Sequence, residues 1–162
     1  MLLGGFIGLE ILPVIQLAIV VDPSLILTAL LGTVLVFASF AFLALFVVPD
    51  EWTLSIGGFL FSSLLVLLAA SVLMIFFPPA SPEAEDRAEW ILIGAGLIVF
   101  SGYVAYDTAV IIKRTKDDKF NVLWDATGLF LDFVNIFVRI LHALIKLKLE
   151  EKSKGGGGKK KD

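Results

Sequence analysis

The sequence predicts an all-α membrane protein, a polytopic helical bundle around a central last helix that carries a polar stripe. Apolar residues make up 58% of its 162 residues, and the mean hydropathy of +0.94 lies far outside the range of soluble domains. These residues gather in five runs, each close to the ~20 residues that a spanning helix needs. With no Cys and a single His, a disulfide framework and a thiolate or His-based zinc centre are excluded.

Short segments rich in turn-forming residues separate the runs, which we expect to span the membrane at about residues 2–21, 25–47, 52–77, 90–112 and 123–147. The separators are Asp22-Pro23-Ser24, Pro49-Asp50-Glu51, Pro78-Pro79 with an acidic loop, and the charged segment 113–121. The first run lacks a basic leader and a small-residue cleavage site, so we expect it to remain as a span. Residues 1–147 are thus expected to form one bundle, and residues 148–162 a flexible basic tail.

The last run carries polar residues at alternating steps of three and four. These are Asp125, Gly128, Asp132, Asn135, Arg139, His142 and Lys146, which we call the polar stripe. On a helix of ~3.6 residues per turn this spacing draws one slowly winding line, with apolar side chains around the rest. Because an ionisable side chain at mid-bilayer costs about 2.5 to 3.5 kcal/mol, the line is expected to face a bundle interior or a water-filled cavity. The stripe predicts a pathway or a switch.

Charge leaves two topologies open for the last run, because basic residues gather both in the loop at 113–119 and in the tail from Lys146 onward. The positive-inside rule places both in the cytosol. A helix that enters the bundle and returns satisfies this, with the acidic 78–89 loop luminal and Met1 cytosolic. A simple crossing is the alternative, since 25 residues cover the hydrocarbon at ~1.5 Å each. With a cytosolic tail, that alternative reverses both assignments.

A second acid, Asp107, lies near the end of the fourth run and precedes the hinge into the stripe. Two carboxyl groups brought together in a low-dielectric bundle cannot both ionise cheaply, so Asp107 and Asp132 are expected to behave as one coupled unit. Protonated, the pair would hold two helices closed. Ionised, it would repel or recruit a cation such as calcium, which prefers oxygen ligands. The alternative is a buried acid that is paired with Arg139 or capped by backbone.

Other polar residues are expected to support the cavity around this pair. Arg139 lies one heptad after Asp132, about 10 Å along the axis, so we expect it to face lipid phosphate or another acid. His142 is expected to be an interfacial or packed histidine, with tuning of the gate as the alternative because an imidazole can change its charge near neutral pH. Lys146 is expected to snorkel to the headgroups. The supporting set is Tyr106, Asp125, Asn135, Arg139, His142 and, flanking Pro13 in the first run, Glu10 and Gln16.

Three separated segments resemble, in this order, the Bax inhibitor family of membrane proteins. They are Val21 to Thr33, Tyr106-Asp107-Thr108, and Gly128 to Leu141. The resemblance covers nearly the whole chain and looks like the eukaryotic endoplasmic-reticulum branch. It implies a helical bundle around a central last helix, a pH-sensitive calcium leak and suppression of cell death. Its paired acids fall on Asp107 and Asp132, which would sense pH and bind calcium transiently.

The resemblance also implies partners and a location. The expected partners are membrane lipid, calcium, protons and cell-death regulator membrane proteins, with calcium as the transported ion, no cofactor and no nucleic acid. Lys159-Lys160-Lys161-Asp162 resembles a cytosolic dilysine retrieval signal, with Lys159 and Lys160 as its lysines, which would hold a multi-pass protein in the endoplasmic reticulum. Basic tails also bind anionic lipid.

The chain departs from the family pattern in three ways. Members usually have about seven membrane segments, and this chain begins within what resembles their third, so the first two are expected to be missing. One of those carries an Arg that the family places near the acid pair. Gly128 stands where relatives often have an acid, and Gln16 where they often have a carboxylate, so the resemblance implies a less negative cavity and weaker calcium binding.

Three functions from different classes remain open. The first is a pH-gated calcium leak with Asp107 and Asp132 as sensor and gate. The second is a non-conducting regulator that binds cell-death proteins. The third is an intramembrane aspartyl protease, which also carries Tyr-Asp on one helix and Asp on the next. The sequence before Asp132 is Leu-Phe-Leu rather than the Gly-x-Gly of such proteases, and paired acids alone do not make a catalytic site.

Overall fold

The computed structural model describes the backbone of residues 2–47, 53–117 and 121–156, and all of its regular elements there are helices. These are α1 (Leu2–Val21), α2 (Ser24–Val47), α3 (Thr53–Phe76), α4 (Pro82–Lys116) and α5 (Val122–Gly156). Four of them, α2 to α5, are long and apolar enough to cross a membrane. The part of α1 whose side chains are described, Ile11–Val21, is apolar but shorter. The chain is therefore a multi-pass helical membrane protein.

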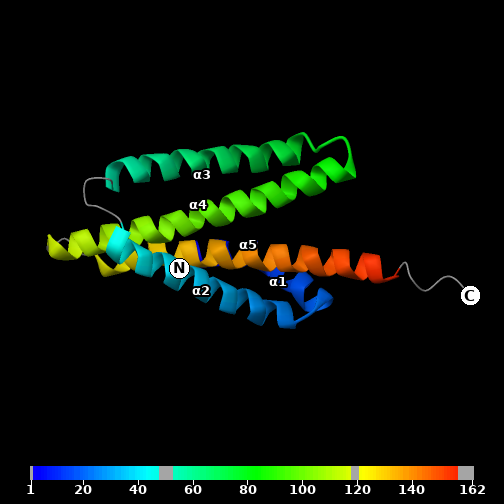
Figure 1. The fold of residues 1–162 in the computed structure, drawn as a ribbon, viewed down its shortest axis with the longest axis horizontal. Coiled ribbons are helices and arrows are strands. Elements are labelled where there is room, and N and C mark those ends of the chain that lie inside the picture. The colour runs from blue at the N-terminus through cyan, green and yellow to red at the C-terminus, as the bar shows by residue number, and fades with distance from the viewer. Residues whose placement is uncertain (1, 48–52, 118–120, 157–162) are drawn as a thin grey trace, which may run out of the picture.

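Helices α4 and α5 run antiparallel at the centre of the bundle, close together where α4 ends and α5 begins and diverging toward the start of α4 (Figure 1). Helix α2 packs on both of them, α1 packs on α5 and α2, and α3 packs on α4. In Figure 1, α3, α4 and α5 follow one another across the bundle, with α2 on the far side of α5 from α3. The last helix is thus central, as the sequence predicted, although α4 shares that place with it.

Helix α4 begins at Pro82, eight residues before the run predicted at 90–112. The side chain of Ser81 caps its first turn by accepting a hydrogen bond from the Ala84 N–H, and Pro82 takes the first helical position. Glu83 and Glu85 in the first turn, and basic residues in the last, complement the helix dipole. These polar turns lengthen the helix at both ends beyond its apolar run.

Helix α5 also continues past its apolar run, because residues 148–156 are helical rather than a flexible tail. Lys148 pairs with Glu151 at 3.0 Å on the helix surface, and Lys152 Nζ donates to the carbonyl oxygen of Val21 at 2.8 Å. The hydrogen bond from Lys152 ties the extension to the end of α1. Since α5 is one unbroken helix of 35 residues antiparallel to α4, the structure favours the crossing topology over re-entry.

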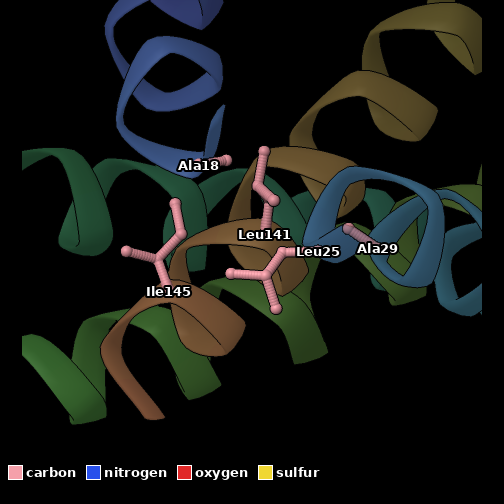
Figure 2. Packing of buried hydrophobic residues seen from close by; sticks show 5 residues of the cluster. All are labelled: Ala18, Leu25, Ala29, Leu141 and Ile145. Atoms are coloured by element: carbon pink, nitrogen blue, oxygen red, sulfur yellow. The ribbon is translucent and has the colours of Figure 1, made fainter. Parts of the chain in front are cut away.

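The largest buried apolar cluster joins α5 to the turn between α1 and α2 (Figure 2). Its members are Ala18, Leu25, Ala29, Leu141 and Ile145. Figure 2 shows the two alanines where α1 and α2 face Leu141 and Ile145 of α5, and small residues at such places let helices approach closely. A second cluster, Phe100, Val104 and Ile136, joins α4 to α5 nearer the candidate site. The first cluster therefore joins α1 and α2 to α5, and the second fixes α4 against α5.

Candidate functional site: an acid pair between α4 and α5

The polar stripe of α5 faces α4, so the line that the sequence predicted is the seam between the two central helices. The contacts run antiparallel along it: Asp125 with Arg114, Gly128 and Asp132 with Asp107, Arg139 with Leu92, His142 with Glu89, and Lys146 with Asp86 and Glu89. Side chains of α4 therefore satisfy most of the stripe. The expectation of a polar interior holds, but helix packing rather than a continuous water-filled cavity fills much of it.

Asp107 and Asp132 meet near the middle of this seam, close enough for their carboxyl groups to form a hydrogen bond. Asp132 is only 6% exposed, and its Oδ2 has no hydrogen-bond partner among the described residues. A hydrogen bond between two carboxyl groups needs a proton, because two ionised carboxylates in contact repel each other. The geometry therefore suits a pair that shares one proton.

Gly128 makes this meeting possible, because it lies one turn before Asp132 and directly against Asp107. A Cβ atom placed on Gly128 would lie 2.8 Å from Oδ2 of Asp107, which is closer than side-chain atoms pack. The missing side chain thus lets the carboxyl group of Asp107 reach the surface of α5. Sequence reasoning noted Gly128 as a lost acid, whereas the structure gives it the role of making space.

Two cavities flank the acid pair, and Asp107 lines both. The one towards the end of α4, which we call the end pocket, has a volume of about 130 Å³ and is lined by Tyr106, Asp107, Val110, Ile111, Arg114, Trp124, Asp125 and Gly128. The one on the other side, the middle pocket, has about 370 Å³ and is lined by Leu64, Phe100, Tyr103, Asp107, Gly128, Leu131, Asp132 and Asn135. Both have room for several water molecules. The acid pair thus lies between the end pocket and the middle pocket.

An ion pair between Arg114 and Asp125 borders the end pocket, with Arg114 Nη1 2.5 Å from Asp125 Oδ1. Asp125 also accepts a hydrogen bond from the backbone N–H of Asn121 at 3.1 Å, while the side chain of Asn121 accepts one from the N–H of Trp124. Sequence reasoning counted Arg114 only as a loop charge. Its position two helical turns after Asp107 was the signal that it belongs to the same side of α4.

Arg139 does not reach the acid pair. Its Nη1 donates to the carbonyl oxygen of Leu92 at 2.9 Å, and its guanidinium lies 5.1 Å from the centre of the Phe100 ring. Gly96 provides the space, because a side chain there would overlap the guanidinium. The charge is therefore held by a carbonyl and an aromatic face rather than by a carboxylate.

His142 and Lys146 belong to a separate charged cluster at the opposite end of the seam. His142 Nε2 lies 3.0 Å from Glu89, and Lys146 pairs with Glu89 and with Asp86, the latter at 2.8 Å. Lys146 also lies 5.6 Å from the ring centre of Trp90. These contacts tie the start of α4 to α5 and keep both basic residues away from the acid pair.

The remaining predicted site residues divide between the two pockets and the surface. Tyr106 and Asp125 line the end pocket, and Asn135 lines the middle pocket while donating to its own helix at the carbonyl of Leu131. Gln16 is exposed on α1 and does not face the acids. The side chain of Glu10 and the residues Lys159 and Lys160 lie outside the described part of the chain.

Among the side chains that the structure describes, no group of three or more His, Cys, Asp or Glu is placed to hold a metal ion. Two carboxyl groups with an amide and a phenol nearby can accept a passing cation weakly, but a tight calcium site takes six to eight oxygen ligands. The arrangement is therefore suited to exchanging a proton or a transient cation.

The amino-acid sequence matches one protein family and several of its curated members. The family model described as "Inhibitor of apoptosis-promoting Bax1" matches residues 1–148. Bax inhibitor 1 of Homo sapiens is 31% identical over 157 residues, which cover 93% of this chain and 62% of the relative. Bax inhibitor 1 of Bos taurus is 30% identical over 159 residues, covering 94% and 63%, and that of Oryza sativa subsp. japonica 33% identical over 150 residues, covering 91% and 58%.

The chain thus spans less than two thirds of the length of these relatives. No solved structure matches it at a significant level.

Proposed function

This chain belongs to the Bax inhibitor family, which is linked to suppression of apoptosis, and we propose that it forms a pH-sensitive calcium leak in the endoplasmic reticulum membrane. The proposed gate is the pair Asp107 and Asp132. The observation that carries the proposal is the place of this pair: two carboxyl groups in contact, between two cavities, on the two central helices.

The gate would work through the shared proton. With the proton in place, the carboxyl groups bond to each other and join α4 to α5 between the end pocket and the middle pocket. When the proton leaves, two negative charges face each other in a low-dielectric bundle, and their repulsion favours separation. A cation entering between them would neutralise both, so loss of the proton opens the contact and creates attraction for calcium.

The cellular part of the proposal rests on the family and on the tail. The relatives that match are named Bax inhibitor 1. On that ground we propose that the chain suppresses cell death and that its partners are cell-death regulator membrane proteins. The lysines 159–161 resemble a retrieval signal, which supports residence in the endoplasmic reticulum. Release of stored calcium would lower the load that this compartment can discharge in a dying cell.

Calcium flux from liposomes containing the purified chain tests the proposal. Flux is measured from pH 5 to pH 8 for the wild type, Asp107→Asn and Asp132→Asn, each first shown to be folded by its helical content. We expect the wild-type flux to change across this range and both variants to lose most of that change, since an amide cannot release the proton. Gln16→Leu, on the exposed side of α1, is the matched control and should leave the pH profile unaltered.

A folded wild type without calcium flux would refute conduction and favour the second candidate, a non-conducting regulator. One feature of the structure supports that candidate: the two pockets are separate cavities with the acid pair between them. Protection from cell death by an Asp107→Asn, Asp132→Asn double variant would then show that the acids are not needed for the regulatory role.

A further inference from the structure

We propose that Arg114 is a tethered counter-cation at the end pocket, which holds the place of a mobile cation beside Asp125 and limits the access of cations to Asp107. The inference rests on the proposed function in one respect, because it assumes that cations approach the acid pair through this pocket. It adds that Arg114 determines which ions enter the end pocket and how fast they enter.

The two partners of the ion pair have very different environments. The side chain of Asp125 is 4% exposed, whereas that of Arg114 is 42% exposed, with 2.5 Å between Nη1 and Oδ1. The acid therefore forms part of the buried wall of the pocket, and the base lies on its exposed side. A cation arriving from that side meets the guanidinium before it meets either Asp125 or Asp107, which line the same pocket.

If the Arg114 side chain moves away, the carboxylate of Asp125 keeps other stabilising interactions. Asp125 keeps the hydrogen bond from the backbone N–H of Asn121 at 3.1 Å, and it stands in the first turn of α5, where the helix dipole favours a negative charge. Arg114 is in the last turn of α4, and its long side chain is already partly exposed. The pair can therefore open by a rotation of one exposed side chain while the buried carboxylate stays in place.

The electrostatic effect of the guanidinium can be bounded. At about 7 Å in the dielectric of bulk water, one unit charge changes the local concentration of a monovalent ion about threefold, and of a divalent ion by about the square of that. Removing the charge should therefore raise access about threefold for monovalent and about ninefold for divalent cations. Fixed cations that act as barriers in this way are a known means of ion selectivity.

Thiol accessibility measures this effect without any need for ion flux. The chain contains no Cys, so Val110→Cys places one thiol in the end pocket. A methanethiosulfonate reagent transfers its thioalkyl group to the thiolate, which forms a disulfide and releases methanesulfinate. We compare rates for the cationic 2-aminoethyl and the anionic 2-sulfonatoethyl reagents, because their ratio cancels any change in the reactivity of the thiol itself.

In the Val110→Cys background, Arg114→Gln should raise the cation-to-anion rate ratio about ninefold, threefold in each direction. Arg114→Lys should keep the original ratio, and Lys116→Gln, which removes an exposed charge from the same turn, should change it less than twofold. Ile111→Cys, also in the pocket lining, replaces Val110→Cys if that variant does not fold. An unchanged ratio in Arg114→Gln, or a thiol that reacts with neither reagent, overturns the proposal.

Flux of calcium and of potassium through the same variants separates this inference from the proposed function. We expect Arg114→Gln to raise the ratio of calcium to potassium flux about threefold. A shifted thiol ratio in a chain that carries no flux would refute conduction and leave the role of Arg114 intact. Flux that keeps its pH dependence, together with an unshifted thiol ratio, would refute the role of Arg114 alone.

Discussion

Gly128→Ala is the smallest change that should separate the two acids of the seam. The new methyl group would lie 2.8 Å from Oδ2 of Asp107, whereas a carbon and an oxygen in ordinary contact are about 3.4 Å apart, so the carboxyl group must retreat by about half an ångström. That retreat moves it away from Asp132 and weakens the hydrogen bond between them. The variant therefore perturbs the proposed gate while both acids remain.

The expected effect on stability is a difference between two opposing terms. Ala is favoured over Gly inside a helix by about 0.5 to 1 kcal/mol, and loss of one internal hydrogen bond costs about 0.5 to 1.5 kcal/mol. Gly94→Ala should gain only the helix-propensity advantage of Ala, because nothing lies within 4 Å of a Cβ atom built there. We expect Gly128→Ala to be about 1 kcal/mol less stable than Gly94→Ala and close to the wild type.

Both variants are unfolded by denaturant in mixed micelles, and their calcium flux in liposomes is recorded from pH 5 to pH 8. Gly94→Ala should keep the wild-type pH profile, whereas Gly128→Ala should shift it, because the shared proton is held less tightly when the carboxyl groups move apart. If the two variants gained the same stability and kept the same profile, Asp107 would not pack against Gly128 and the geometry of the gate would be wrong.

Three further predictions concern other parts of the bundle. Arg139→Leu should change the free energy of unfolding by less than about 1 kcal/mol, because the cost of a charge in the bilayer roughly cancels its cation–π contact and hydrogen bond; a loss above about 3 kcal/mol in mixed micelles would contradict this. Leu141→Ala, at a fully buried position, should cost about 2 kcal/mol, near the lower end for cavity-forming changes because the lipid is itself apolar, while Leu147→Ala, at 52% exposure, should cost much less. The hydroxyl and the backbone N–H of Ser24 both donate to Asp22 and hold the pKa of this carboxyl below its ordinary value. The ionised carboxylate therefore stabilises the fold above its unfolded pKa, and this stabilisation is lost as the pH falls through the folded pKa. Ser24→Ala should raise the pKa of Asp22 in an NMR titration.

The sequence was sufficient to predict the helices and the two acids that meet, because those features follow from local patterns. Pro, Asp and Ser between apolar runs put the starts of α2 and α3 within a residue or so of where they lie. The steps of three and four in the stripe placed Asp125, Asp132 and Arg139 on one side of α5. The place of Asp107 near the hinge into the stripe suggested that it meets Asp132, and the resemblance to a family then implied the same pair.

What the sequence did not predict are the partners across the seam, since these depend on the register of α4 against α5. Arg139 was expected to face a phosphate or an acid, but Gly96 and Phe100 provide a space and a ring instead. His142 was counted among the residues that support the cavity, with a packed or interfacial position as the other interpretation, and the antiparallel register carries it to Glu89 at the far end. The helical extension after residue 147 depends on contacts with the end of α1, which no local pattern reveals.

The central claim is that Asp107 and Asp132 act as one proton-sharing unit, and a double-variant cycle on the pH dependence of calcium flux tests it most directly. Residues that work as a unit are not additive. We predict that the Asp107→Asn, Asp132→Asn double variant loses no more of the pH response than either single variant. Two partial losses that add up in the double variant would mean that the acids titrate independently, and the account of a shared latch would be wrong.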